Sequence, residues 1–314
     1  MTEILVMSPS FGQWSEIPGR ILQSANVQVR KPSRPSPLSS EEAAEEIGDA
    51  DAIIVGLDQV DENAIAAATN LKVIAKHGVG VDNIDVEAAM RRGIKVVNVP
   101  GANSEAVADL VVGLMLNLLR QINTADQDLR AGNWSNFAGP ELSELTVGIL
   151  GYGRIGRGVK KRVEAFGAKI AAFDPYAPED AFKGVQRMDS EHELLEASDL
   201  VTLHLPGGSD KPLIGEKELK LIGSQGYLIN SARGELVDEH AVANALHNNE
   251  LRGYAADAFM EEPPRNSPLL TAPRTILTPH IGAFTSATNE RMGVSVVEDI
   301  LAVLNGREPK FEVK

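Results

Sequence analysis

Three glycines between residues 151 and 156 have the spacing of a turn that binds a diphosphate. They follow the apolar run 147–150 and precede a segment with apolar residues at helical spacing. In such a strand, turn and helix, Gly151 permits the tight turn, Gly153 lets a diphosphate approach the backbone, and Gly156 lets the helix pack closely against the strand. A tight turn without a ligand is the alternative. The cofactor contacts expected from this turn are Gly151, Gly153, Arg154, Ile155 and Gly156.

An acidic residue stands where a dinucleotide-binding turn requires one. A second predicted strand, 169–173, ends in Asp174, about 20 residues beyond the glycines, as in dinucleotide-binding folds. Its carboxylate can accept hydrogen bonds from the adenosine ribose and would repel a 2′-phosphate, and residues 175–177 include no arginine to receive one. The sequence therefore predicts NAD rather than NADP. A phosphate-loop nucleotidase is excluded because Arg157 and Gly158 follow the last glycine, in place of lysine and serine or threonine.

Six histidines are candidates for moving a proton during a hydride transfer. His280 closes a strand-like run in the sequence TPHIG, and the small residues after it let a ligand approach, so it is the candidate acid and base. His204 lies with Pro206 at a predicted strand end, where it is expected to line the cofactor cleft without chemistry. His77 precedes the turn 78–80 and either lines the substrate side or packs a loop.

The composition narrows the classes of function. The chain has 314 residues, a net charge of −14 and no cysteine. Because it also lacks a long basic segment, it is not expected to bind nucleic acid or an anionic membrane. The absence of cysteine excludes disulfides, thiolate metal sites and cysteine nucleophiles. The sequence shows no metal-binding spacing such as His-Glu-x-x-His, so hydride chemistry must rely on an organic cofactor.

The sequence does not suggest export or a membrane span. The apolar run 4–7 has no basic region before it and is predicted to be a strand, which favours a cytoplasmic location. The longest apolar stretch, 106–119, is interrupted by Asp109 and Asn117 and is shorter than the roughly 20 residues of a membrane helix. It is predicted to be a buried helix, with a subunit interface as an alternative setting.

Short β-branched runs alternate with segments of helical spacing, which predicts parallel sheets covered by helices. The strands expected in the first part of the chain are 4–7, 52–55, 73–75 and 95–97. A helix is expected at 40–47, because Ser39 or Ser40 can cap it and glutamates follow in its first turn.

Two domains are expected from the length and from a hydrophobic content of 43%. A long helix from about Ser104 leads to a second alternating series that begins at Leu145. A last helix, 286–304, follows that series and is expected to return to the first domain. The predicted domains are therefore 1–99 with 286–314, and 100–285.

Six ordered segments resemble the D-isomer-specific 2-hydroxyacid dehydrogenase family, and within it the phosphoglycerate dehydrogenase-like members. The resemblance covers almost the whole chain. The segments are 76–85 (KHGVGVDNID), 98–105 (NVPGANSE), 151–156 with Asp174, 230–238 (NSARGELVD), 256–263 (ADAFMEEP) and 278–282 (TPHIG). The resemblance implies hydride transfer between NAD and C2 of a small 2-hydroxy or 2-keto acid.

By this resemblance, the catalytic trio of the family falls on Arg233, Glu262 and His280. A planar guanidinium can hold the carboxylate and the carbonyl oxygen of the substrate together, which a lysine cannot copy. Glu262 paired with the imidazole would favour the protonated form of His280, which gives its proton to the substrate as the hydride arrives. In the oxidation, the neutral histidine is the base. On the residues alone, an ion-pair arginine and a surface glutamate beside Glu261 are the alternatives.

The resemblance also implies two doubly wound α/β domains, a Rossmann NAD-binding domain and a flavodoxin-like substrate domain, with the active site in the cleft between them. The expected substrate contacts are Lys76, His77, Val79, Gly80 and Arg233. The further expected cofactor contacts are Ser104, Asp174, His204, Pro206, Ala232, Asp257 and His280. A plain turn at 79–80 and a strand-end cap at Asp257 are the alternatives. Members of the family usually dimerise through the cofactor domain, so a homodimer is expected.

Two positions limit the identification of the substrate. Phosphoglycerate dehydrogenases that resemble this chain tend to carry an arginine after the strand that ends here at Val55, and this sequence has Gly56. Lys76 stands at the other expected cation position, and the chain ends at Lys314 without the regulatory extension of some of those enzymes. Phosphoglycerate, hydroxypyruvate, glyoxylate and other short polar 2-keto acids therefore all stay candidates.

One alternative belongs to a different class of protein. Some relatives of the same fold are NAD-sensing corepressors, which bind protein partners and turn over little substrate. The intact trio favours an enzyme, although such relatives can keep it. Formate dehydrogenase, another relative, is disfavoured because it has a glutamine where Glu262 stands.

Overall fold

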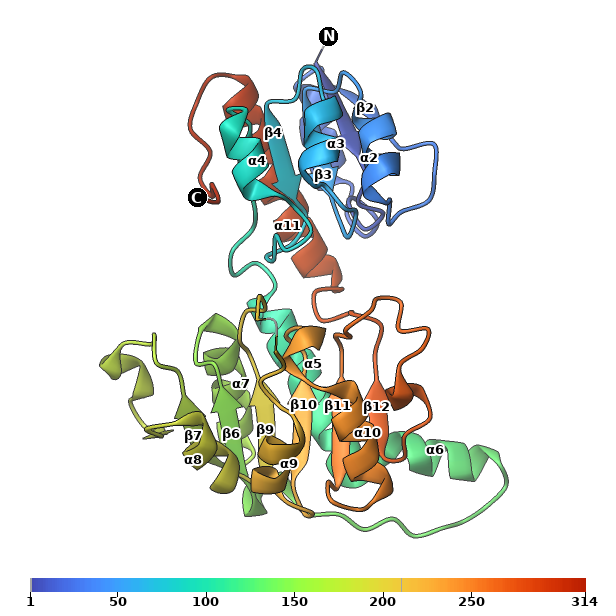
Figure 1. The fold of residues 1–314 in the computed structure, drawn as a ribbon, viewed down its shortest axis with the longest axis vertical. Helices are drawn as coiled ribbons and strands as arrows, with labels where there is room; N and C mark the ends of the chain where they lie inside the picture. Colours follow the sequence, from blue (N-terminus) through green and yellow to red (C-terminus); the bar gives the residue numbers. More distant parts are fainter. Residues whose placement is uncertain (1, 210) are drawn as a thin grey trace. The chain divides into compact units, whose positions relative to one another are not determined.

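The computed structural model describes residues 2–209 and 211–314, and its contacts divide the chain into two compact units. The first unit comprises the chain up to Asn103 together with Ala283–Lys314, and the second comprises Ser104–Gly282 (Figure 1). Each unit has one sheet in which all pairs of neighbouring strands are parallel. The predicted α/β class with parallel sheets is confirmed.

The first unit is built on a five-stranded sheet with the order β2-β1-β3-β4-β5, the flavodoxin-like order. Its strands are β1 (Glu3–Val6), β2 (Gln28–Arg30), β3 (Ala52–Val55), β4 (Val73–Lys76) and β5 (Lys95–Val97). Its helices are α1 (Ile17–Ser24), α2 (Ser40–Ile47), α3 (Glu62–Ala67), α4 (Val86–Arg91) and α11 (Ser286–Leu304). The strand predicted at 4–7 is wrong by one residue, because the N–H groups of Met7 and Ser8 both bond to the Ile54 carbonyl and end the regular pairing.

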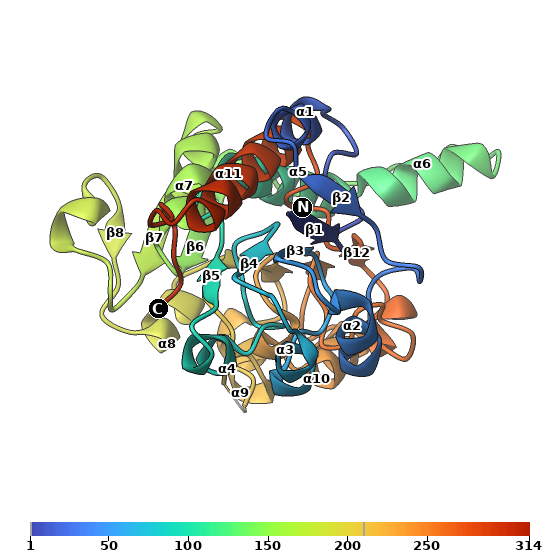
Figure 2. The same ribbon diagram turned by 90° about the horizontal axis from the view of Figure 1, so that it is seen from above.

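Alternate residues of the central strands face two helical layers. Ile53 of β3 packs in the cluster that contains residues of α2, α3 and α4, and Ile54 packs with residues of α1 and α11. Figure 2 shows these two layers on opposite sides of the sheet. The last helix therefore returns to the first unit, as predicted, and it contacts α1 and β4. Of the two serines proposed to cap α2, Ser39 is the cap, and Glu42 closes a capping box with it.

The second unit contains a seven-stranded sheet with the order β12-β11-β10-β9-β6-β7-β8, which is the Rossmann order with one strand added. Its strands are β6 (Thr146–Leu150), β7 (Lys169–Phe173), β8 (Gln186–Arg187), β9 (Leu200–Leu203), β10 (Tyr227–Asn230), β11 (Gly253–Ala256) and β12 (Thr275–Leu277). Its helices are α5 (Ser104–Arg120), α6 (Ile122–Arg130), α7 (Arg154–Ala165), α8 (Glu191–Glu196), α9 (Glu216–Ile222) and α10 (Glu239–His247). Short 3-10 turns are η1 (Leu142–Glu144), η2 (Glu179–Phe182), η3 (Gly234–Leu236) and η4 (Pro268–Leu270).

The seven-stranded sheet is also covered on both faces. Residues of α5 and α7 pack on one face, and residues of α8, α9 and α10 pack on the other. The apolar stretch predicted to be a buried helix is α5, and Val111 and Met115 at its centre are fully enclosed. Because the strands are parallel, their carboxyl ends form one edge, where parallel α/β sheets bind ligands.

Helix α6 is the exception to this close packing. It projects from the second unit in both views, and the segment after it returns toward the sheet (Figures 1 and 2). None of its residues is buried, and Ile122, Leu129 and the following Trp134 expose large apolar side chains. Among residues 2–209 and 211–314, no helix combines the length and apolar character needed to cross a membrane.

Candidate active site

The glycine turn joins β6 to α7 with little space around two of its three glycines. Gly151 has a φ of 93°, and a Cβ there would lie 2.5 Å from the carbonyl oxygen of His204. A Cβ at Gly156 would lie 2.3 Å from the carbonyl oxygen of Gly151, so α7 packs tightly on the turn. Gly153 differs, because a Cβ there would meet none of the described residues beyond its chain neighbours within 4 Å. The open side of the turn is therefore at the N-terminus of the 12-residue helix α7.

Asp174 lies directly against this turn. It follows β7, and its carboxylate accepts hydrogen bonds from the N–H groups of Tyr152 (2.8 Å) and Tyr176 (2.9 Å). Each oxygen thus has one backbone donor and keeps capacity for another. The turn and the carboxylate, predicted separately from the sequence, occupy one place at the sheet edge, and Arg154 and Ile155 begin the helix beside them.

Glu262 and His280 form a hydrogen-bonded pair at the other end of the same edge. His280 Nδ1 lies 2.9 and 2.8 Å from the two carboxylate oxygens of Glu262, whose Oε1 also accepts the Phe259 N–H at 3.1 Å. Because a carboxylate only accepts, Nδ1 is the donor, and Nε2 is the nitrogen that can exchange a proton with a ligand. The side chain of His280 is 40% exposed, so a small molecule can reach it.

The two members of the pair stabilise each other's charged forms. The hydrogen bond with Glu262 raises the pKa of His280 above its ordinary value, against the effect of burial, and the charges of Glu262 and Asp257 add to the rise. Burial alone would raise the pKa of Glu262, but the hydrogen bond and charge of His280 outweigh it and the pKa is lowered. The pair therefore favours an imidazolium beside a carboxylate.

Arg233 brings a positive charge to the same place. Its charge acts on both Glu262 and His280, lowering the pKa of each. Its own segment is fixed by the Asn230 side chain, which donates to the Arg233 carbonyl (2.7 Å), and Arg233 Nη1 donates to the carbonyl of Ala232 (2.8 Å). The structure thus brings the three predicted catalytic residues together.

The Arg233 segment touches the loop of Glu262 through a glycine. A Cβ at Gly234 would lie 1.9 Å from the carbonyl carbon of Phe259 and 2.2 Å from the nitrogen of Met260. Only a residue without a side chain allows the two backbones to approach so closely. Gly234 therefore lets the two segments pack closely, a role that was not predicted from the sequence.

Asp257 anchors the segment that carries His280. It is 2% exposed, and its carboxylate accepts hydrogen bonds from the Thr278 hydroxyl (2.6 Å) and the N–H groups of Ile281 and Gly282 (2.8 Å each). Burial raises the pKa of this carboxyl. These bonds enclose His280, which has a φ of 51°, a left-handed conformation that few non-glycine residues adopt. The sequence suggested Asp257 as a cofactor contact, and spacing alone could not reveal that its partners lie more than twenty residues away.

His204 occupies the end of β9, next to Pro206. Its Nε2 lies 3.0 Å from the Thr202 hydroxyl, and its Nδ1 is buried without a partner among the described residues. Burial lowers the pKa of His204 to about 3, so the ring is neutral. A neutral, enclosed imidazole suits a lining role better than acid and base chemistry. Ser104, another expected cofactor contact, is buried as the first residue of α5.

Four of the five predicted substrate residues, Lys76, His77, Val79 and Gly80, lie in the first unit, at or just after the carboxyl end of β4. The ammonium of Lys76 is 2.6 Å from the Gly56 carbonyl oxygen and also donates to the side chain of Asn83. The residue is only 7% exposed, so this cation is held within the loops. Val79 and Gly80 are partly exposed, and the Val79 carbonyl accepts from Asn98 (2.7 Å).

His77 is buried rather than open to solvent. Its Nδ1 is 3.1 Å from the Ser10 hydroxyl and 3.4 Å from that of Ser8, and the ring of Phe11 meets it edge-on. Burial lowers its pKa to about 4. Of the two interpretations offered by the sequence, these contacts favour the histidine that packs a loop.

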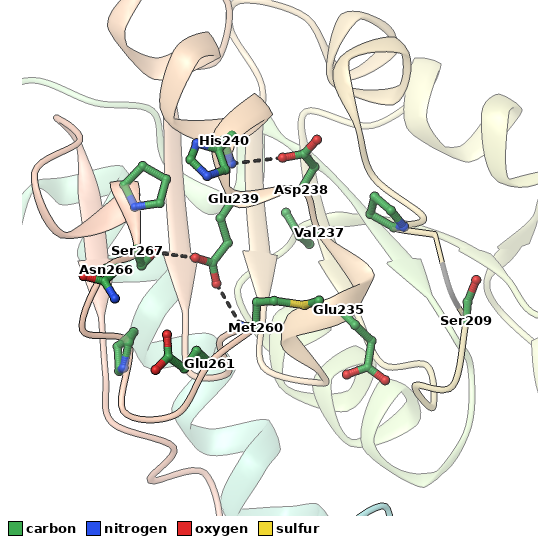
Figure 3. Close-up of a pocket in the computed structure, with 13 residues that line it drawn as sticks. Ser209, Glu235, Val237, Asp238, Glu239, His240, Met260, Glu261, Asn266 and Ser267 are labelled. Carbon is green, nitrogen blue, oxygen red and sulfur yellow. Dashed lines mark hydrogen bonds between the residues drawn. The ribbon is translucent and has the colours of Figure 1, made fainter.

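In the part of the chain that the structure describes, no group of three histidine, aspartate or glutamate side chains is arranged to hold a metal ion. A pocket of about 410 Å³ lies beside the loop of Glu262, and several carboxylates line it, among them Glu235, Glu239 and Glu261 (Figure 3). These three were not predicted from the sequence.

Comparison with known proteins identifies relatives of the chain. The family model "D-isomer specific 2-hydroxyacid dehydrogenase, NAD binding domain" matches residues 112–282. The chain is 44% identical over 275 residues to D-3-phosphoglycerate dehydrogenase of Methanocaldococcus jannaschii, covering 86% of this chain and 52% of that protein. It thus spans about half the length of this relative. It is 38% identical over 288 residues to glyoxylate reductase of Thermofilum pendens, covering 88% of this chain and 85% of that protein.

A solved structure resembles the whole fold. It is an NADPH-dependent glyoxylate/hydroxypyruvate reductase from Sinorhizobium meliloti in complex with NADP and malonate. It superposes with a TM-score of 0.85 at 30% identity, covering 99% of this chain and 96% of that chain.

Proposed function

We propose that this chain, which belongs to the D-isomer specific 2-hydroxyacid dehydrogenase family, interconverts a small 2-hydroxy acid and its 2-keto acid by hydride transfer at C2. The observation that carries the proposal is the hydrogen-bonded pair of Glu262 and His280 with the charge of Arg233 beside it. The nicotinamide cofactor, when bound, would supply the hydride as NADH in the reduction and accept it as NAD⁺ in the oxidation.

The three side chains divide the work on the substrate. In the reduction, His280 gives a proton from Nε2 to the oxygen on C2, and in the oxidation it takes that proton back. Glu262 supports the reduction because it raises the pKa of His280 and so keeps the acid form present. The guanidinium of Arg233 binds the carboxylate and the C2 oxygen, where it stabilises the negative charge that develops.

The glycine turn supports a bound dinucleotide. The open side at Gly153 and the N-terminus of α7 favour a diphosphate. Asp174 is proposed to accept from the adenosine ribose and to disfavour a 2′-phosphate, so we favour NAD even though the Sinorhizobium relative is NADPH-dependent. Asp257 uses three of its four acceptor sites, which leaves one for the carboxamide. The other proposed contacts are Ser104, Arg154, Ile155, His204, Pro206 and Ala232.

The substrate is proposed to be a short polar 2-keto acid. Its carboxylate is assigned to Arg233, and Val79 and Gly80 stay the backbone contacts expected from the family resemblance. Lys76 is already held by the Gly56 carbonyl and Asn83, so it offers a phosphate less than a cation that points into solvent would. We therefore expect hydroxypyruvate to rival phosphohydroxypyruvate.

A homodimer is proposed as the working assembly. The support is α6 with the segment after it, which projects from the second unit and exposes Ile122, Leu129 and Trp134. A second copy of the chain would remove this apolar surface from water.

A panel of 2-keto acids tests the proposed function. The assay follows NADH and NADPH oxidation with glyoxylate, hydroxypyruvate and phosphohydroxypyruvate, and we expect NADH to be preferred at least about tenfold. His280→Ala should lower turnover by about 100- to 10,000-fold and leave NADH binding, followed by fluorescence, largely intact. Binding of NADH without turnover of any acid would instead favour the corepressor alternative. A preference of about a thousandfold for the phosphorylated acid would refute the assignment of the substrate.

A further inference from the structure

Glu239 holds the loop that carries Glu262. The hydrogen bonds of Glu239 go to Met260 and Ser267 and not to Glu262 or His280. It is the first residue of α10, and its side chain points toward the loop that follows β11 (Figure 3). One carboxylate oxygen accepts the N–H of Met260 at 2.9 Å, and the other accepts the hydroxyl of Ser267. The carboxylate therefore ties the two sides of the loop that contains Glu262.

The peptide between Phe259 and Met260 is the point where these contacts meet. The N–H of Phe259, which belongs to the peptide group before it, bonds to Glu262. The N–H of Met260, which belongs to this peptide group, bonds to Glu239. Gly234, next to Arg233, lies against the same peptide. Two successive peptide groups are thus bonded to one carboxylate each, and the second also lies against the backbone of the arginine segment.

Few packed side chains restrain this loop on its outer side. Glu239 lines the pocket of about 410 Å³, Met260 is 72% exposed, and Glu261 is also exposed. Hydrogen bonds to a charged acceptor are stronger than those between neutral groups, and the first turn of a helix stabilises a carboxylate. The two bonds to Glu239 therefore restrain the exposed side of the loop, while Phe259 and Leu269 anchor it in the core.

We infer that Glu239 is a positioning residue, which fixes the Phe259–Met260 peptide so that Glu262 stays hydrogen-bonded to His280 with Arg233 beside them. The inference rests on the proposed function, in which His280 is the acid and base. The charged groups that act on His280 are Glu262, Asp257 and Arg233. Glu239 therefore acts on His280 through the position of Glu262.

Three single variants of the full-length protein test this role. Glu239→Ala removes both hydrogen bonds, and Glu239→Gln keeps an oxygen that can accept from Met260. Glu261→Gln is the matched control, because it removes one charge at the same pocket from a side chain with no hydrogen bond to the described residues. The measurements are kcat/KM for reduction of a 2-keto acid, the Kd for NADH, and the titration of the His280 imidazole by NMR.

We expect Glu239→Ala to lower kcat/KM at least about tenfold, with the Kd for NADH unchanged within about twofold. The pH midpoint of His280 should fall, because the Glu262 hydrogen bond that raises it is loosened. Glu239→Gln should keep most of the activity, and Glu261→Gln should match the wild type. If Glu239→Ala behaves like Glu261→Gln in both rate and titration, the inference is refuted.

Two further points keep the test decisive. If Glu239→Ala does not fold, Ser267→Ala removes one of the two bonds and should give a smaller loss in the same direction, and no loss would refute the inference. The NMR titration needs no turnover. A protein that reduces none of the acids would therefore refute the proposed function, while the titration would still decide the role of Glu239.

Discussion

Replacement of Gly234 by alanine should separate the arginine from its catalytic partners. A Cβ at this position would lie 1.9 Å from the carbonyl carbon of Phe259, 2.1 Å from its oxygen and 2.2 Å from the nitrogen of Met260. All three atoms belong to backbone, so no flexible side chain can move aside. The two segments that carry Arg233 and Glu262 must therefore separate.

The size of this displacement follows from the distances. Ordinary contact to a Cβ begins at 3.4 Å, so the backbones must move apart by about 1.5 Å. A misplacement of about 1 Å in an active site can cost roughly 100-fold in rate. We expect Gly234→Ala to lower kcat/KM by at least about 100-fold, which corresponds to about 2.7 kcal/mol of transition-state stabilisation. Overpacking should also cost about 1–3 kcal/mol of folding free energy.

Steady-state reduction of a 2-keto acid measures the loss, and NADH fluorescence shows whether the glycine turn is intact. Gly19→Ala is the control, because a Cβ at Gly19 in α1 would have no neighbour within 4 Å among the described residues. It should keep full activity and gain about 1 kcal/mol of stability from the better helix propensity of alanine. A Gly234→Ala protein that is folded and within about threefold of wild-type kcat/KM would refute the reasoning.

Two pH-dependent predictions follow from His280 and His77, which are two of the three histidines with shifted pKa values. Reduction needs protonated His280, so kcat/KM should fall as the pH rises through the raised pKa of His280. Glu262→Gln removes the carboxylate that raises this pKa, so the fall in kcat/KM should begin at a lower pH. A fall that begins at the same pH would place the acid elsewhere. Burial lowers the pKa of His77 to about 4, whereas the ordinary value in an unfolded chain is 6.5. The unfolded chain therefore binds a proton at His77 more readily than the folded protein does, and stability should be lost as the pH falls below 6.5. In urea unfolding, His77 alone should contribute about 1.6 kcal/mol to the loss of stability between pH 6.5 and 5, measured as the difference between the wild type and His77→Gln.

The parts of the fold that local sequence signals determine were predictable. The helix at 40–47 has its predicted limits because Ser39, the glutamates and the apolar face lie within one short segment. The glycine turn with Asp174 was predictable for a related reason, since a strand, a turn, a helix and the end of the next strand follow one another in sequence. Helix α6 was not predicted, although its Ile122, Ala125 and Leu129 stand at helical spacing, and none of its residues is buried.

Interactions between residues that are distant in sequence limit how much of the site could be predicted. The family resemblance pointed to Arg233, Glu262 and His280, but no spacing reveals that Asp257 bonds to Thr278, Ile281 and Gly282. The sequence also does not predict the direction in which a long side chain points. Lys76 was predicted to face the substrate, and the sequence could not show that its ammonium also donates to the Gly56 carbonyl, a contact that depends on the path of a neighbouring loop. That expected substrate contact stays a prediction.

The return of α11 to the first unit determines the order in which the two units can mature during synthesis. Met292, Val296 and Ile300 of this helix share a core with Ile4 and Val6 of the first strand. All of Ser104–Gly282 is translated between these two groups, which takes roughly 10 to 40 s at about 5–20 residues per second. The second unit, continuous in sequence, can therefore fold first. Until the last helix leaves the ribosome, α1 alone covers this apolar face of the first sheet, and the nascent chain depends on other means to keep the uncovered part from aggregating.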